Sequence, residues 1–154
     1  MNLNRRSLFA AAALIVPGLS VASAAATKEG GDKPRGVVIH VGANDPEVMN
    51  TALNNATNVV KYYADKGGAP SIEIVANGPG LHMFRADTSP VKGRLLAFAA
   101  RMPEVEFSAC SITKQGMESA EGKEIAIVPQ AKLVPAGIVR LMERQEKGWG
   151  YVRP

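Results

Sequence analysis

The chain has 154 residues, of which 46% are apolar, 21% are charged and 5% are aromatic. This length suits one domain, since domains commonly contain roughly 100–200 residues, and the apolar fraction is enough to build a core. One cysteine and two histidines exclude a disulfide framework, a cysteine-only zinc cluster and a CxxC redox motif, and they argue against a metal site. The low aromatic content argues against a base-stacking surface for nucleic acid.

The first 26 residues have the pattern of an export signal. Asn4-Arg5-Arg6 precedes an uncharged stretch whose apolar centre, Leu8 to Val16, is too short for a transmembrane helix, which needs about 20 residues. Pro17-Gly18 follows, and small residues at 22–26 offer a cleavage site. The pattern predicts a signal peptide of the twin-arginine or Sec type, and therefore a periplasmic protein without a stable membrane anchor once the signal is removed. An uncleaved membrane anchor is the alternative.

Removing the signal changes the charge of the chain. Its two arginines belong to the 18 basic residues, so 16 remain against 14 acidic residues and the net charge falls from +4 to +2. The basic residues of the remainder are scattered singly along the sequence, whereas a phosphate-tracking surface needs them clustered. We therefore expect no nucleic-acid partner.

Extended and helical patterns alternate from the signal onward. Residues 27–35, with a glycine pair and a proline among charges, predict a flexible leader. The β-branched run 37–41 lies between glycines and predicts a strand buried on both faces. Asn44-Asp45-Pro46 supplies a helix start, and apolar residues at three- and four-residue steps over 49–63 predict an amphipathic helix.

The middle of the chain repeats this alternation. Residues 71–76 predict a second strand, which the turn 77–80 closes. Ser89-Pro90 begins a second helix that ends at Pro103, and residues 105–109 predict the third strand.

The C-terminal third is read in the same way. Its predicted elements are a short helix over 113–118, a fourth strand over 132–134, a helix from 138 to Gly148 and a fifth strand over 149–152. Within residues 121–130, positions 125–128 fit a strand or a loop equally. Strands that alternate with helices predict one doubly wound α/β domain, with a mostly parallel five-stranded sheet between two helical layers, over residues 36–154.

The single thiol falls where such a fold carries its sites. Ligands bind at the carboxyl ends of the strands, where the strand order reverses. With the order 2-1-3-4-5, the loop Gly42–Asp45, which contains Asn44, would face Cys110 across a crevice between the first and third strands. Cys110 precedes a helix start that Ser111 or Thr113 can cap, and a helix N-terminus lowers the pKa of a thiol. The alternative is that Cys110 is a small buried hydrophobic residue.

Other candidate residues surround this predicted crevice. His40 is either a core histidine or a crevice residue, and His82 either lines the neighbouring loop or lies on the surface. Asn77 belongs to the turn 77–80, which lacks the spacing of a phosphate or dinucleotide motif. Asn54 and Asn58, close to Asn55, share a helix face that either packs on a loop or partner subunit or is solvated. A flavin is a topological possibility, but no Ser/Thr-rich phosphate loop follows the first strand, and we predict no cofactor.

The order and spacing of several segments resemble the DsrE/DsrF-like family over nearly all of residues 36–154. The segments are Val38–Val41, Leu53–Ala56 with Asn58, Val75–Gly80, Phe107–Cys110 with Thr113, Val134–Gly137 and Gln145–Tyr151. The resemblance implies a flavodoxin-like fold that assembles into trimers or hexamers. In the sulfur-relay members it also implies a cysteine that accepts sulfane sulfur as a persulfide, and Cys110 looks like its counterpart. Those members are cytoplasmic, whereas this chain carries an export pattern.

The sequence thus leads to two hypotheses. In the first, the protein is a periplasmic sulfur carrier or sulfurtransferase that takes sulfur from a sulfane donor and passes it to the thiol of a partner protein. Because the chain has no second cysteine, any exchange at Cys110 must use another molecule. In the second, the protein is a non-catalytic oligomeric module that binds a small ligand or a partner, and Cys110 is structural.

Overall fold

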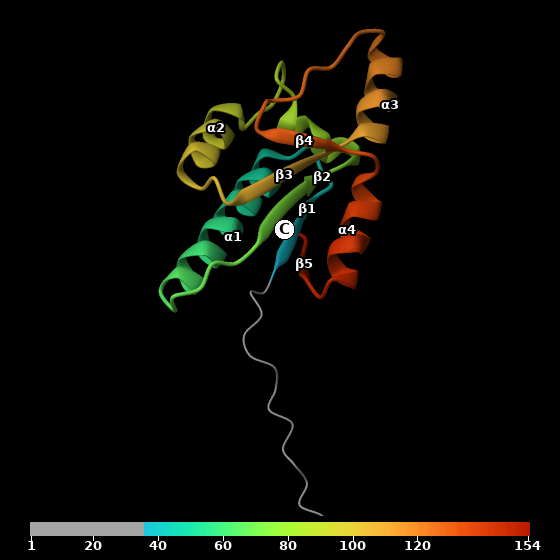
Figure 1. Cartoon of the computed structure of the whole chain (residues 1–154). Helices are drawn as coiled ribbons and strands as arrows, with labels where there is room; N and C mark the ends of the chain where they lie inside the picture. Colours follow the sequence, from blue (N-terminus) through green and yellow to red (C-terminus); the bar gives the residue numbers. More distant parts are fainter. Residues whose placement is uncertain (1–35) are drawn as a thin grey trace, which may run out of the picture. The chain divides into compact units, whose positions relative to one another are not determined.

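The computed structural model describes residues 36–154 (Figure 1). The predicted signal peptide and the predicted leader therefore lie outside the described residues. The described part contains five strands and four α-helices, together with one 3₁₀ helix. In chain order these are β1 (Val37–Val41), α1 (Pro46–Ala64), β2 (Ile72–Ala76), η1 (Gly78–Phe84), α2 (Lys92–Arg101), β3 (Val105–Cys110), α3 (Ser111–Glu121), β4 (Ala131–Val134), α4 (Gly137–Glu146) and β5 (Gly150–Val152).

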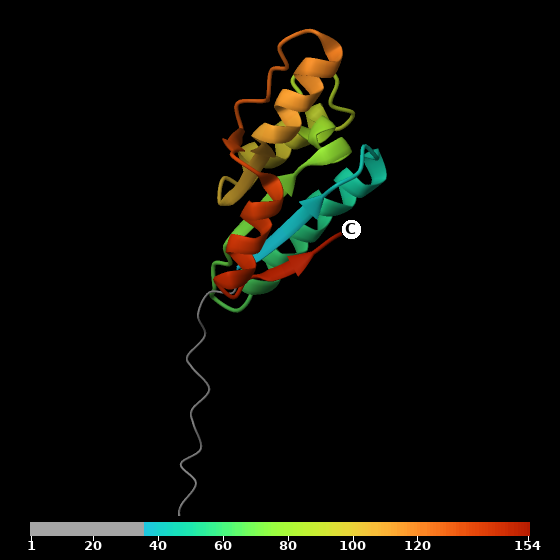
Figure 2. The same ribbon diagram turned by 90° about the vertical axis from the view of Figure 1, so that its right-hand side faces the viewer.

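All five strands form one sheet, and every strand pair in it is parallel. Helices α1 and α2 lie on one side of this sheet and α4 lies on the other (Figure 1). Figure 2, which looks onto the second side, shows α4 in front of the strands and α3 above α4. The predicted α/β sandwich with helices on both faces of a parallel sheet is confirmed.

The assumed strand order 2-1-3-4-5, on which the predicted crevice depends, is wrong. The sheet has the order β4-β3-β2-β1-β5, so β2 separates β1 from β3, and the crevice expected between the first and third strands does not exist. The cause is α4, which contacts four strands, β1, β2, β3 and β5, and carries the chain from one edge of the sheet to the other. The strand order therefore reverses between β1 and β5. Local sequence patterns do not predict this reversal, because it joins strands that are far apart in the chain.

Several element boundaries also differ from the predicted ones. Helix α2 begins at Lys92 rather than at Ser89-Pro90, and α3 extends beyond the predicted 113–118 on both sides. The predicted turn 77–80 is the start of η1. Residues 125–128 are a loop held by one isolated antiparallel bridge, between Arg85 and Ile127.

The side of the sheet that faces α1 and α2 holds the main apolar core. Successive strand residues point to opposite faces, and on this side Ile39, Ile74 and Phe107 pack with Leu53 of α1 and Leu95 of α2. Aromatic rings reinforce the packing, because the ring of Phe107 meets two other phenylalanine rings edge to face at 5.7 and 6.0 Å. This layer fixes the strands whose ends carry the candidate site.

The side that faces α4 has a smaller apolar core. Leu141 packs there with Val38 and Val75, and Trp149 covers them. Within residues 36–154, no helix has both the length and the apolar character of a membrane span.

Candidate functional site

Cys110 lies at the junction between a strand and a helix. It is the last residue of β3 and the N-cap of α3, and its Sγ accepts a hydrogen bond from the backbone N–H of Thr113 at 3.5 Å. Phe107 and Ala109 point into the α1–α2 core, so the alternation along β3 directs Cys110 toward the α4 side. The residue is only 5% exposed.

A second helix N-terminus meets the same thiol. Ala76 pairs with Ala109 in the sheet, so the residues that follow them, Asn77 and Cys110, are neighbours on the α4 side. Gly137, the first residue of α4, lies directly on this pair. A Cβ atom on Gly137 would come within 2.9 Å of the Asn77 Cβ and 3.2 Å of the Cys110 Cβ. A glycine is therefore required for α4 to approach the thiol so closely.

These contacts act on the pKa of the Cys110 thiol in opposite directions. Burial raises the pKa, but hydrogen bonds from the Thr113 side chain and from the backbone N–H groups of Gly137, Thr113 and Ile112 lower it, and the pKa lies below its ordinary value. The N–H groups come from the first turns of α3 and α4, whose dipoles also favour an anion. The site consequently stabilises the thiolate more than the surroundings of an ordinary cysteine do.

The capping of α3 differs from the prediction. Cys110 itself is the N-cap, and neither Ser111 nor Thr113 takes that role. Ser111 is the first helical residue and is half-buried. The Thr113 hydroxyl instead accepts a hydrogen bond from the backbone N–H of Gly78 at 3.0 Å. It thereby ties the start of η1 to the first turn of α3.

A chain of polar side chains runs from Asn77 toward the other edge of the sheet. Asn77 Oδ1 accepts from His40 Nε2 at 2.9 Å, and His40 Nδ1 bonds the Tyr151 hydroxyl at 2.8 Å. A carbonyl oxygen only accepts, so the first bond places a proton on Nε2. His40 is half-buried, and this bond connects it to the residue beside Cys110.

The remaining predicted site residues lie apart from the thiol. Asn44 is exposed in the loop after β1, and because β2 stands between, the loop Gly42–Asp45 is not the opposite wall of a crevice at Cys110. His82 belongs to η1, is half-buried, and its Nδ1 lies 3.5 Å from the Thr88 hydroxyl.

The asparagine face of α1 does pack against a neighbouring element. The Asn54 side chain accepts from the guanidinium of Arg94 in α2, which also bonds Asn50. Asn58 is exposed. The face is therefore divided between a helix–helix contact and solvent.

A buried carboxylate beneath α4 was missed by the sequence analysis. Glu73 of β2 is fully buried and accepts hydrogen bonds from the Ser108 hydroxyl and from the guanidinium groups of Arg140 and Arg144. Burial raises the pKa of Glu73, but these bonds outweigh it and the pKa lies below its usual value. Both arginines belong to α4, so the cluster holds that helix, and with it the N–H group of Gly137, against the sheet.

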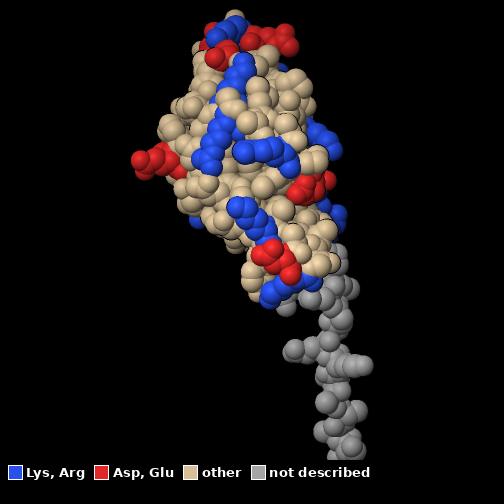
Figure 3. All heavy atoms as spheres, turned by 90° about the vertical axis from the view of Figure 1, so that its left-hand side faces the viewer, with Lys and Arg blue, Asp and Glu red and all other residues tan. Residues whose placement is uncertain are grey.

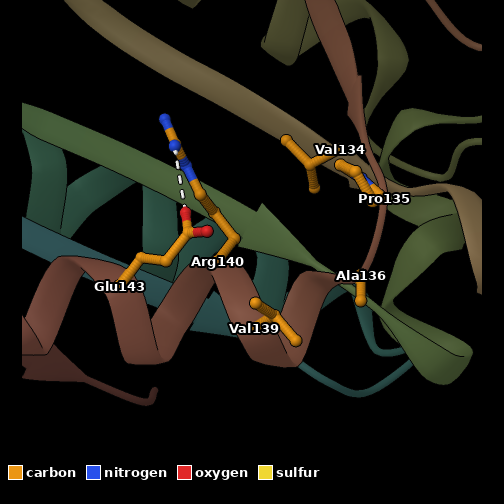
Figure 4. A pocket seen from close by; sticks show the side chains of 6 residues that line it. All are labelled: Val134, Pro135, Ala136, Val139, Arg140 and Glu143. Carbon is orange, nitrogen blue, oxygen red and sulfur yellow. Dashed lines mark hydrogen bonds and ion pairs between the residues drawn. The ribbon is translucent and has the colours of Figure 1, made fainter.

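Two hollows adjoin α4, and Cys110 lines neither. The first measures about 140 Å³ and lies between the end of β4 and α4, where Val134, Pro135, Ala136 and Val139 form apolar walls and Arg140 pairs with Glu143 (Figure 4). The second measures about 320 Å³ at the amino ends of the strands. The first is smaller than an ordinary ligand pocket of roughly 300–1,000 Å³. Neither of these two hollows contains the thiol.

The described residues offer no arrangement for a metal. In the segment 36–154, no group of three or more histidine, cysteine, aspartate or glutamate side chains is placed to hold a metal ion.

Comparison with known proteins gives one informative similarity. The solved structure of MTH1491, a protein of unknown function from Methanobacterium thermoautotrophicum, resembles this chain with a TM-score of 0.65 and 26% identity, over 78% of this chain and 99% of that one. No family model matches the chain, and no curated protein does so either. The similarity agrees with the fold, and the residues of the site must carry any functional conclusion.

Proposed function

We propose that the protein is a periplasmic sulfur carrier of the DsrE/DsrF-like type, in which Cys110 holds sulfane sulfur as a persulfide. One observation carries the proposal. The sulfur of Cys110 lies where the first turns of α3 and α4 converge, and N–H groups from both helices lower its pKa. The resemblance of residues 36–154 to that family gives independent support.

The chemistry needs only the thiolate and a donor. The Cys110 thiolate attacks the terminal sulfur of a sulfane donor, a sulfur–sulfur bond forms, and the donor's own sulfur–sulfur bond breaks with its electron pair leaving on the donor. A partner thiolate then attacks the outer sulfur of the persulfide, and Cys110 leaves as a thiolate. The backbone N–H groups that stabilise the thiolate also stabilise the persulfide anion. No oxidant is consumed.

Mass spectrometry of the protein tests the proposal. Chain without residues 1–26 is incubated with thiosulfate or inorganic polysulfide, and we expect a mass gain of one sulfur that dithiothreitol reverses. Cys110→Ser is the matched control and must show no gain. A wild-type protein that takes up no sulfur, or a serine variant that takes up as much, contradicts the proposal.

The burial of Cys110 favours a second candidate, a non-catalytic binding module with a structural cysteine. A 5% exposed residue packed under Gly137 resembles an ordinary core cysteine. The two candidates differ in the rate at which the native thiol reacts. Alkylation by iodoacetamide across pH reports the pKa of the thiol, and an inert thiol supports the module. Measurable alkylation with a pKa below that of a free cysteine supports the carrier.

Export and assembly belong to the same proposal. Residues 1–26 support export, and the outer face of α4, where Ile138, Val139 and Met142 are about half exposed, supports an oligomer because neighbouring exposed apolar residues mark contact surfaces. Fractionation of cells that express the full chain tests export. We expect the protein in the periplasm. When Arg5→Lys and Arg6→Lys are combined, a cytoplasmic precursor indicates the twin-arginine route and continued export indicates the Sec route. A wild-type chain that remains in the cytoplasm contradicts this part.

A further inference from the structure

Two groups of hydrogen-bond donors at the carboxyl edge of the sheet have no partner within residues 36–154. Asn77 uses its Oδ1 to accept from His40, which leaves both N–H bonds of Nδ2 unpaired. The exposed guanidinium of Arg153 forms no ion pair with any carboxylate of the described chain. By contrast, every arginine on α4 bonds at least one carboxylate. The edge therefore offers donors to an anion that residues 36–154 do not supply.

Short distances connect these donors into one row that ends at the thiol. A Cβ atom on Gly42 would lie 3.2 Å from His40 Nε2 and 3.7 Å from an Nη atom of Arg153. A Cβ atom on Gly137 would lie 3.3 Å from Asn77 Nδ2 and 3.2 Å from the Cys110 Cβ. The guanidinium of Arg153 thus stands over the end of β1, the Asn77 amide at the end of β2, and the thiol at the end of β3.

The strand spacing sets the size of ligand that this row fits. Neighbouring strands lie about 4.8 Å apart, and the sheet places β2 between β1 and β3. The cation and the thiol are therefore separated by roughly 10 Å. Thiosulfate is too short to reach from the guanidinium to the thiol, and an inorganic polysulfide has no carboxylate for the planar guanidinium fork. A small organic persulfide with a carboxylate at the far end spans this distance.

We propose that the donor for Cys110 is a carboxylate-bearing small-molecule persulfide, which Arg153 binds through the carboxylate and the Asn77 amide contacts at its middle. The inference rests on the proposed function, since it names the donor for the same thiol. Arginine suits the task because its planar fork binds a carboxylate with two parallel hydrogen bonds. His40 and Tyr151 act as positioning residues, because their bonds hold Oδ1 of Asn77 away from the donor and so present Nδ2 to it.

The transfer step balances without a further reagent. The Cys110 thiolate attacks the outer sulfur of the protonated persulfide, RSSH, and the bond between the two donor sulfurs breaks with its electron pair leaving on the inner sulfur. The proton of the donor moves to that sulfur, which departs as the thiol RSH. Cys110 retains the anionic persulfide, which the N–H groups of α3 and α4 stabilise.

Binding of an inert analogue tests the site without any sulfur chemistry. S-methylglutathione, a thioether with two carboxylates, is titrated by calorimetry into the protein without residues 1–26. We expect Arg153→Gln to weaken binding about tenfold, as the loss of one charge-assisted hydrogen-bonded pair implies, and added salt to weaken binding to the wild type more than to the variant. Arg101→Gln, an exposed arginine of α2, is the matched control and should change nothing. Equal affinity of wild type and Arg153→Gln overturns the proposal, as does the absence of binding.

Sulfur transfer separates this inference from the proposed function. With glutathione persulfide as donor, we expect Arg153→Gln to raise the half-saturating concentration about tenfold with little change in the maximal rate, and Arg153→Lys to restore part of the loss. With inorganic tetrasulfide the two proteins should react alike. If wild type and Arg153→Gln take up sulfur from both donors with the same half-saturating concentrations, the donor assignment is overturned but the carrier function remains intact. If neither donor transfers sulfur, the carrier function is overturned, and the calorimetric result then decides on the binding site alone.

Discussion

The two sides of the sheet use different kinds of interaction. On the side of α1 and α2, the main buried cluster is apolar, and residues such as Ile39, Leu53 and Phe107 are almost completely excluded from solvent. On the side of α4, the buried layer contains Glu73 with two arginines, and only a few apolar residues pack beside them. All predicted site residues on the strands, namely His40 and Cys110, face this second side.

The charged residues on the two surfaces show the same difference. Lysine and arginine side chains lie among neutral surface on the α1–α2 face (Figure 3), and Lys92, Arg94 and Arg101 bond only carbonyl or amide oxygens in the described structure. On the α4 side, Arg140 and Arg144 bond carboxylates. Apolar packing is tolerant of direction, whereas charge-assisted hydrogen bonds are directional. We infer that the first side supplies stability and the second side positions the thiol.

The largest expected effect comes from the apolar side. Leu53→Ala leaves a cavity at a fully buried position and should lower the free energy of unfolding by about 3 kcal/mol, measured by urea denaturation. The pKa of the Cys110 thiol in the folded variant should stay unchanged. Leu133→Ala, at a half-exposed edge position, is the control and should cost less than about 1 kcal/mol. A shifted thiol pKa in Leu53→Ala would show that the two sides are not separable.

A smaller loss of stability is expected at the buried carboxylate, but with an effect on the site. Glu73→Gln keeps the shape and removes the charge, and since Arg140 and Arg144 are partly exposed water can solvate them, so we expect a loss of about 2 kcal/mol rather than the full penalty of a broken buried pair. Because α4 is held less firmly, the pKa of the Cys110 thiol should also rise. Glu106→Gln removes an exposed partner of the same arginines and should cost under about 1 kcal/mol.

The pH dependence of stability checks the same cluster. The pKa of Glu73 is lowered in the folded state, so its contribution is fully present above the ordinary value of 4.5 and is lost as the pH falls through the lower folded value. The difference in unfolding free energy between wild type and Glu73→Gln should therefore be constant near neutral pH and shrink on acidification below about 4.5. A difference that grows on acidification contradicts the assignment.

Local patterns predicted the thiol's position but not its surroundings. The strand predicted over 105–109 and the helix predicted after it place Cys110 at a strand–helix junction, as the structure shows. The approach of Gly137 and Asn77 depends on the strand order and on the crossing of α4, which involve residues far apart in the chain. Short-range periodicity does not contain that information.

Glu73 shows why a buried charge escapes sequence analysis. It stands between Ile72 and Ile74, and the alternation along a strand suggests a residue that faces solvent. Its partners Arg140 and Arg144 follow 67 and 71 positions later. From the helical pattern alone, each arginine would be expected on the solvent-exposed face of its helix. Only the fold brings the three charges together and makes their burial favourable.

A closer test of the α4 side removes one contact of the thiol. Gly137→Ala places a Cβ against Asn77 and Cys110, which should push the first turn of α4 away, raise the pKa of the thiol and slow its alkylation at neutral pH. The stability loss should be about 1 kcal/mol, since crowding is offset by the better helix propensity of alanine. Gly116→Ala, in α3 with open space around it, is the control and should leave the thiol unchanged. An unaltered thiol pKa in Gly137→Ala would show that α4 does not act on Cys110.

The smallest effect on monomer stability is expected on the outer face of α4, where assembly is tested. Met142 is 52% exposed and follows Ile138 by one turn, so Met142→Glu puts a charge into the proposed contact between copies and should dissociate it, as measured by sedimentation velocity. The unfolding free energy of the monomer should change by no more than about 0.5 kcal/mol. Tyr62→Glu, at a similarly exposed position of α1, should leave assembly intact. A wild-type monomer would contradict the proposed assembly. An oligomer that Tyr62→Glu breaks and Met142→Glu does not would place the contact on the α1 side of the sheet.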